Sequence, residues 1–168
     1  WQQLVKQLEE AKPTVVFVGY GMASSFEGEA GLAKFKKDYN RLLDTIEQIS
    51  PGVRFVLVGP IDHHDTLAWN HCARLDEERA HNKNLDRYRD AIREIGQSRA
   101  ARVISLQRLN GSSNFAWTDN GIHLTSYGYI LAAQEIEKGL GWKSGAWITV
   151  RGRNQSEPLR QAILRKNE

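Results

Sequence analysis

Cysteine is almost absent from this sequence, since Cys72 is the only one among 168 residues. One thiol excludes an internal disulfide and leaves the redox compartment undetermined. Apolar runs of the ~20 residues that a membrane helix needs are missing as well. The N-terminus lacks the order of a signal peptide, but the chain opens at Trp1 and its only methionine is Met22. We therefore leave the compartment open, with an extracytoplasmic location and a targeting segment upstream as one option.

A strong charge of either sign is also missing. The net charge is +3, and the five basic and two acidic residues of Arg151–Glu168 account for it. A nucleic-acid binder needs a basic face with interleaved aromatic residues, and none is evident outside that segment. We expect neither a nucleic-acid nor a membrane partner. With 40% apolar and 26% charged residues, the sequence predicts one globular domain over residues 1–150 and a basic C-terminal extension over 151–168.

Three short runs of β-branched and aromatic residues predict strands that are covered on both faces, at residues 14–18, 55–58 and 102–106. Apolar residues at helical spacing surround them, at residues 1–12, 32–49, 85–95 and, after Thr125 as N-cap, up to Gly139 or Gly141. We expect irregular loops over residues 61–82 and 107–124, and one more strand or an extended arm over 147–150.

The alternation of strands and helices predicts βαβ units with right-handed crossovers, and hence an α/β fold with a mainly parallel sheet. Ligands bind beyond the carboxyl ends of the strands in such sheets. Three segments that follow strands should therefore meet at one edge, namely residues 19–30, 59–82 and 107–124.

The third of these segments contains the most specific signal. His123 stands at the end of a loop, with Asp119 four residues earlier and a helix directly after it. General-base catalysis needs this combination, because a carboxylate fixes the tautomer of an imidazole and stabilises its cation. The alternative is structural: His123 caps the helix and Asp119 forms a turn.

The first segment is a strand followed by the glycine-rich turn Gly19-Tyr20-Gly21-Met22-Ala23-Ser24-Ser25. Such a turn brings backbone N–H groups close to a ligand, although a tight turn that needs positive φ is an equal alternative. The spacing is not that of a dinucleotide-binding loop. Ser24 and Ser25 are either N-terminal caps of a helix or replacement nucleophiles, but no G-x-S-x-G elbow surrounds them.

Together the two segments resemble the SGNH, or GDSL-type, ester hydrolases. The family has a G-x-N-D oxyanion motif, which Gly21-Met22-Ala23-Ser24 resembles, and a D-x-x-H motif before its last helix, which Asp119–His123 resembles. The resemblance covers about residues 1–142. It implies a three-layer α/β/α, flavodoxin-like fold, hydrolysis of acyl esters without a cofactor, His123 and Asp119 as catalytic residues, and Gly21 and Ala23 in the oxyanion-hole region.

Three departures from the family pattern qualify this resemblance. Ala23 replaces the asparagine that donates to the oxyanion, and losing such a donor costs on the order of 10² to 10³ in turnover. Asp119 precedes His123 by four residues, and Asn120 holds the three-residue position. The serine of the family's Gly-Asp-Ser motif has no match. We therefore expect a fragment whose nucleophile and first strands lie upstream, and self-association or a second chain that supplies those strands.

The second segment is rich in histidine, with Asp62-His63-His64-Asp65 followed by His71 and Cys72. Metal ligation is one interpretation, but adjacent side chains on an extended loop point in opposite directions. We expect no metal here. A loop that contacts a polar substrate through His63 and His64 is a second interpretation, with Ser24 and Trp117 on the same edge and Trp69 and Trp117 placed to stack on a sugar ring. A solvated loop is the third.

Two other functions remain open. A non-catalytic module of the same fold, binding a carbohydrate or a peptide, would explain Ala23 and the missing serine. A flavodoxin-like domain would bind a phosphate or flavin at the turn of residues 19–25. The leading hypothesis is an ester hydrolase, with acetylated carbohydrates as the candidate substrate class.

Overall fold

The computed structural model describes residues 1–64, 72–109, 116–142, 161–162 and 165. Its elements in chain order are the helices α1 (Gln2–Ala11), α2 (Leu32–Ile49), α3 (Cys72–Ser98) and α4 (Ser126–Gly139), the 3₁₀ helix η1 (Ser24–Gly31), and the strands β1 (Val15–Val18), β2 (Arg54–Val58) and β3 (Arg102–Ile104). The strands form a parallel sheet in the order β1-β2-β3. The predicted α/β fold with a parallel sheet is confirmed.

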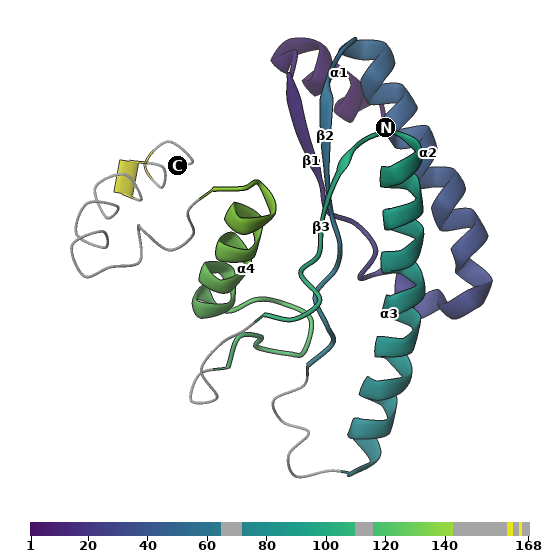
Figure 1. Cartoon of the computed structure of the whole chain (residues 1–168), viewed down its shortest axis with the longest axis vertical. Coiled ribbons are helices and arrows are strands. Elements are labelled where there is room, and N and C mark those ends of the chain that lie inside the picture. The colour runs from purple at the N-terminus through teal and green to yellow at the C-terminus, as the bar shows by residue number, and fades with distance from the viewer. Residues whose placement is uncertain (65–71, 110–115, 143–160, 163–164, 166–168) are drawn as a thin grey trace.

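Both faces of the sheet are covered by helices (Figure 1). On one face, β2 contributes Phe55 and Leu57 to a core that it shares with α1, α2 and α3. On the other face, Val56 of the same strand packs with Leu131 and neighbouring residues of α4. Successive side chains of a strand point to opposite faces, so a strand between two layers must be apolar at every position. This explains the unbroken apolar run that predicted β2.

Helix α2 buries the stripe that its spacing predicted. Phe35, Tyr39, Leu43 and Ile46 are at most 8% exposed and face the sheet. Gly21, at the carboxyl end of β1, has a φ of 127° and lies against Pro60, which follows β2. Only glycine adopts such a φ without strain, so the turn after β1 has the conformation that the structural alternative required.

The long helix α3 corrects one expectation. Residues 61–82 were expected to form a polar loop, but the helix begins at Cys72. Its first turns are rich in Ala, Arg and Glu, which favour helix without needing a wide apolar stripe. Figure 1 shows α3 continuing past the end of the sheet toward the loops that follow β1 and β2. Because it extends so far, polar residues of α3 can reach those loops.

Helix α4 begins as predicted, with Thr125 as its N-cap. The Thr125 hydroxyl accepts a hydrogen bond from the N–H of Gly128 at 3.1 Å. A Cβ atom added to Gly128 would lie 2.0 Å from the carbonyl oxygen of Trp117. The lack of a side chain at Gly128 therefore lets the loop before α4 pack directly on the helix.

Several expectations fall outside the described residues. These include the strand or arm at 147–150, most of the basic extension 151–168, and the side chains of Asp65, Trp69, His71 and Cys72. Within the described part of the chain, no helix has the length and apolar character that crossing a membrane requires.

The contact at Gly128 leads to a prediction. Gly128→Ala should lower the free energy of unfolding by about 1–3 kcal/mol, because overpacking forces the helix and the loop apart. Ser126→Ala, in the exposed first turn of the same helix, is the matched control and should change stability by less than about 0.5 kcal/mol. Urea denaturation followed by circular dichroism measures both. Equal stabilities of the two variants would contradict the close packing.

Candidate functional site

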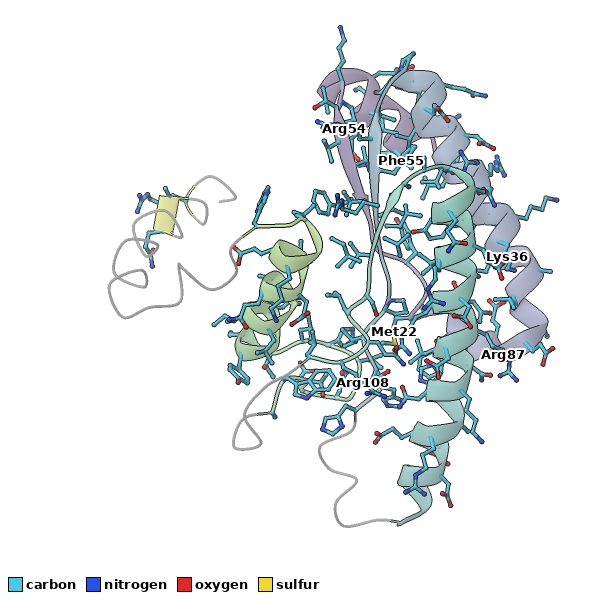
Figure 2. All side chains as sticks on the ribbon, viewed as in Figure 1. Met22, Lys36, Arg54, Phe55, Arg87 and Arg108 are labelled. Carbon is cyan, nitrogen blue, oxygen red and sulfur yellow. The ribbon has the colours of Figure 1, made fainter. Side chains whose placement is uncertain are left out.

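The three predicted segments meet beyond the carboxyl ends of the strands. The backbone N–H of His64 donates to the carbonyl of Gly121 at 2.9 Å, and the Thr118 hydroxyl donates to the carbonyl of His64 at 2.7 Å. Gly21 packs on Pro60. In Figure 2, Met22 lies at this end of the sheet, between α3 and the loops that lead to α4. We call this region the rim.

The side chain of Asn120 holds the ring of His123. Its Nδ2 lies 2.8 Å from the Nδ1 of His123, and its Oδ1 accepts the backbone N–H groups of Ile122 and His123 at 3.3 and 3.0 Å. Two backbone donors fix the amide orientation, because a flipped amide would place its NH₂ group against two other N–H groups. Nδ2 therefore donates to Nδ1, and the neutral imidazole carries its proton on Nε2.

Asp119 lies beside this arrangement without entering it. Its backbone N–H donates to the carbonyl of His123 at 3.0 Å, in the short bridge between Thr118 and Leu124. Among the described residues, its exposed carboxylate has no hydrogen-bond partner. The position that we expected for Asp119, against the imidazole, is thus held by Asn120. The reason is local: at three residues' separation, the side chain reaches both the ring and the backbone of the turn.

Helix α3 clamps the loop that follows β2. Arg89, with a side chain that is 5% exposed, donates to the carbonyls of Pro60 and Ile61 at 3.0 and 2.8 Å and to Asp62 at 2.7 Å. Burial raises the pKa of Asp62, and the Arg89 guanidinium opposes that rise. The side-chain amide of Asn82 pairs with the backbone N–H and carbonyl of His63, at 2.8 and 2.9 Å. Residues 60–64 therefore form a fixed platform.

A chain of polar groups connects this platform to the glycine turn. The Ser25 hydroxyl lies 2.6 Å from the carbonyl oxygen of Met22 and 2.7 Å from Nε2 of His81, and Nδ1 of His81 lies 3.0 Å from Nδ1 of His63. Ser25 and His81 are buried, and the Phe26 ring stacks on His81 with centroids 3.9 Å apart. Burial is the main cause that lowers the pKa of His81 to about 4, so this ring is neutral at pH 7.

The sequence did not single out His81 or Arg89. A signal was present, because His81, Leu85, Tyr88 and Ile92 follow one another at spacings of four, three and four and are all buried. The buried stripe of α3 thus extends toward the N-terminus of the helix and includes His81. A polar residue on such a stripe must find a partner inside the protein.

The serines of the glycine turn do not act as helix caps. Ala23 is the N-cap of η1 and makes no side-chain cap bond, and Ser25 donates to a carbonyl instead of accepting from an N–H group. Ser24 lines a hollow of about 340 Å³ together with Tyr20 and Trp1. Ser25 is completely buried. Among the described residues, no serine hydroxyl hydrogen-bonds to His123.

His64 and Trp117 face each other across two loops. Their rings are parallel within 3° with centroids 5.0 Å apart. One face of the Trp117 indole is therefore covered by His64. His63 and His64 have different partners, as expected for neighbours on an extended segment. Within the described part of the chain, no three His, Cys, Asp or Glu side chains are grouped as metal ligands would be.

A comparison with protein families places the chain. The model of the GDSL-like Lipase/Acylhydrolase family matches residues 1–131. The chain belongs to this family. No curated protein matches the sequence at a significant level. Membership supports an esterase-type function.

Solved structures share the fold of this chain. A catalytic mutant of an acetylxylan esterase from Geobacillus stearothermophilus matches with a TM-score of 0.54 and 14% identity, covering 83% of this chain and 68% of that one. A protein from Parabacteroides merdae ATCC 43184, assigned as a GDSL-like lipase, matches with a TM-score of 0.57 and 17% identity, covering 83% of this chain and 69% of that one. At these identities the likeness establishes the fold alone.

The contact between Asn120 and His123 leads to a prediction. Asn120→Asp should move the imidazole proton from Nε2 to Nδ1, because a carboxylate accepts from the ring and from both backbone N–H groups at once. Nitrogen chemical shifts of the His123 ring measure the change. Asp119→Asn is the matched control and should leave the ring unchanged. A proton that already resides on Nδ1 in the unmodified chain would contradict the assignment.

The buried His81 leads to a prediction about pH. Its pKa is about 4 in the folded chain against an ordinary 6.5, so the unfolded state takes up a proton first as pH falls. The free energy of unfolding therefore has its full value with respect to His81 above pH ~6.5, and it decreases as pH falls from ~6.5 to ~4. His81→Phe, which keeps a ring against Phe26, should remove this part of the pH dependence. Urea unfolding at pH 7.5 and 4.5 measures it, and parallel pH dependences of the two proteins would contradict the shift.

Proposed function

We propose that this chain supplies the catalytic histidine, His123, of an active site that hydrolyses acyl esters, with acetylated carbohydrates as substrates. The observation that carries the proposal is the imidazole of His123, exposed at the rim and held through Nδ1 by Asn120. One of the proteins with a similar fold is an acetylxylan esterase, which supports an acetylated sugar as the substrate class in our proposal. The half-buried His63, His64 and Trp117 on the same rim supply polar and aromatic contacts suited to hydroxylated rings.

The nucleophile of this reaction lies outside the 168 residues in our proposal. Ser25 is buried and its hydroxyl proton is directed to a carbonyl, so it cannot attack an ester. Ser24 opens into a hollow with Tyr20 and Trp1, and no hydrogen bond joins it to His123. A serine from an upstream segment would attack the ester carbonyl. His123 would take up the serine proton and then return it to the leaving alcohol.

The resting hydrogen bonds of this site favour slow turnover. A base must present a free nitrogen to the serine, whereas Asn120 leaves the proton of His123 on Nε2. The analogous change from aspartate to asparagine in a serine protease lowers turnover by about 10⁴. Ala23 lacks the side-chain donor to the oxyanion, which costs on the order of 10² to 10³ more.

These two features favour a second candidate function. A member of the same fold that binds a carbohydrate without hydrolysing it needs the rim but neither a basic Nε2 nor an oxyanion donor. In that case the Nε2–H group of His123 would donate a hydrogen bond to the ligand. The nucleophile and the turnover would both be absent.

Acetate release from acetylated xylo-oligosaccharide distinguishes these possibilities. The 168-residue chain should release no acetate above the buffer rate, because no described serine reaches His123. Turnover that disappears in His123→Ala would show that the nucleophile lies within the chain.

The second arm of this experiment uses the polypeptide as its gene encodes it, including any sequence upstream of Trp1. This form should release acetate, and His123→Ala should abolish the release. Ser50→Ala, in a buried residue at the far end of α2, is the control and should keep the activity. An extended polypeptide that binds the oligosaccharide and releases nothing would favour the binding module.

A further inference from the structure

The hydrogen-bonded groups of Met22, Ser25, His81 and His63 allow only one consistent placement of their protons. A serine hydroxyl carries one proton, and a carbonyl oxygen can only accept. Ser25 must therefore donate to Met22, at 2.6 Å, because otherwise two lone pairs would face each other at that distance. It follows that the hydroxyl oxygen accepts from His81, and that Nε2 of His81 carries a proton.

The same count continues to His63. His81 is neutral because burial disfavours its cation, so a proton on Nε2 leaves a lone pair on Nδ1. The Nδ1 of His63 lies 3.0 Å from this lone pair and must donate to it. When His63 is neutral, its Nε2 therefore carries no proton and can only accept a hydrogen bond.

The position of His63 is also fixed, by contacts with Asn82 and His81. Its backbone N–H and carbonyl are both paired with the side chain of Asn82, and its ring is held edge-on to His81 with centroids 5.0 Å apart. The residue as a whole is half-buried, so part of it is open to solvent. The next residue, His64, is bonded to the loop that carries His123. His63 thus belongs to the same rim.

We propose that His63 is a ligand-binding residue whose Nε2 accepts a hydrogen bond from a substrate hydroxyl, and that Ser25 and His81 are positioning residues that fix its tautomer. A free sugar hydroxyl is such a donor, whereas a carboxylate or a phosphate has only acceptors to offer. This deepens the proposed function and rests on it for the carbohydrate class. In the resting tautomers the two imidazoles offer opposite groups, since Nε2 of His63 is an acceptor and Nε2 of His123 is a donor.

The tautomer can be measured directly. Long-range ¹H–¹⁵N spectra of the labelled chain at pH 7.5 should show an unprotonated Nε2 for His63, assigned by the signal that disappears in His63→Phe. Ser25→Ala removes the group that selects the tautomer of His81, so the His63 signals should move toward a mixture. Ser50→Ala, a matched change at another buried serine, should leave them unchanged. A protonated Nε2 in the unmodified chain would overturn the proposal, whether or not Ser25→Ala folds.

Binding of xylotriose tests the ligand class. His63→Phe should weaken binding about five- to tenfold, as expected for one hydrogen bond, and His63→Gln, which keeps an acceptor oxygen, should recover part of it. Titration followed by NMR should also shift the His63 Nε2 signal. Equal affinities for the unmodified chain and His63→Phe, or no binding of xylotriose at all, would overturn the proposal.

Neither measurement needs turnover. An extended polypeptide that releases no acetate would contradict the proposed hydrolysis, while His63 could still accept a hydrogen bond from xylotriose. Acetate release that is unaffected by His63→Phe, together with equal xylotriose affinities, would contradict the role of His63 and leave the hydrolysis in place.

Discussion

The buried guanidinium of Arg89 is the interaction on which the arrangement of the rim depends. A charge this deep in a protein is stable only when its donors are paired, and removing one side of such an arrangement typically costs about 3–5 kcal/mol. Arg89 meets this requirement with two carbonyls of the loop after β2 and with the carboxylates of Asp62 and Asp86. Asp86 also accepts from Gln107, which follows β3. Arg89 and Asp86 of α3 together thus join the segments that follow two neighbouring strands.

The positions of the rim histidines follow from this anchor. Because Arg89 holds residues 60–62 against α3, His63 lies against His81 and Asn82 of the same helix. His64 in turn pairs with the turn that carries His123. The catalytic candidate is therefore placed by contacts that begin in a helix distant from it in sequence. Much of the site's geometry comes from hydrogen bonds to backbone carbonyls, which place a loop without needing a specific sequence in it.

Because hydrogen bonds to backbone groups place much of the site, only some of its features could be predicted from the sequence. The strands and the stripe of α2 follow from apolar spacing, and the meeting of the three loops follows from the rule that parallel strands end at one edge. The choice between Asp119 and Asn120 does not follow from spacing. It depends on which side chain can satisfy the backbone N–H groups of Ile122 and His123, and those groups become visible only once the turn is built. His81 was missed because it lies in a segment that was expected to be a loop and is part of α3. Arg89 was missed because a polar residue in a helix looks solvated until its neighbours are known.

Two of the three departures from the family pattern, Asn120 and Ala23, have a common physical consequence. A carboxylate in place of Asn120 would draw the imidazole proton to Nδ1, and an amide in place of Ala23 would supply a donor for a developing oxyanion. Each difference removes an interaction that matters most in a transition state, while the clamps of Arg89 and Asn82, which hold the ground-state shape of the rim, remain in place. Contacts made equally in the ground state and the transition state support binding, whereas only contacts that strengthen in the transition state speed the reaction. We therefore propose that the rim of this chain is better suited to binding a ligand than to transforming it.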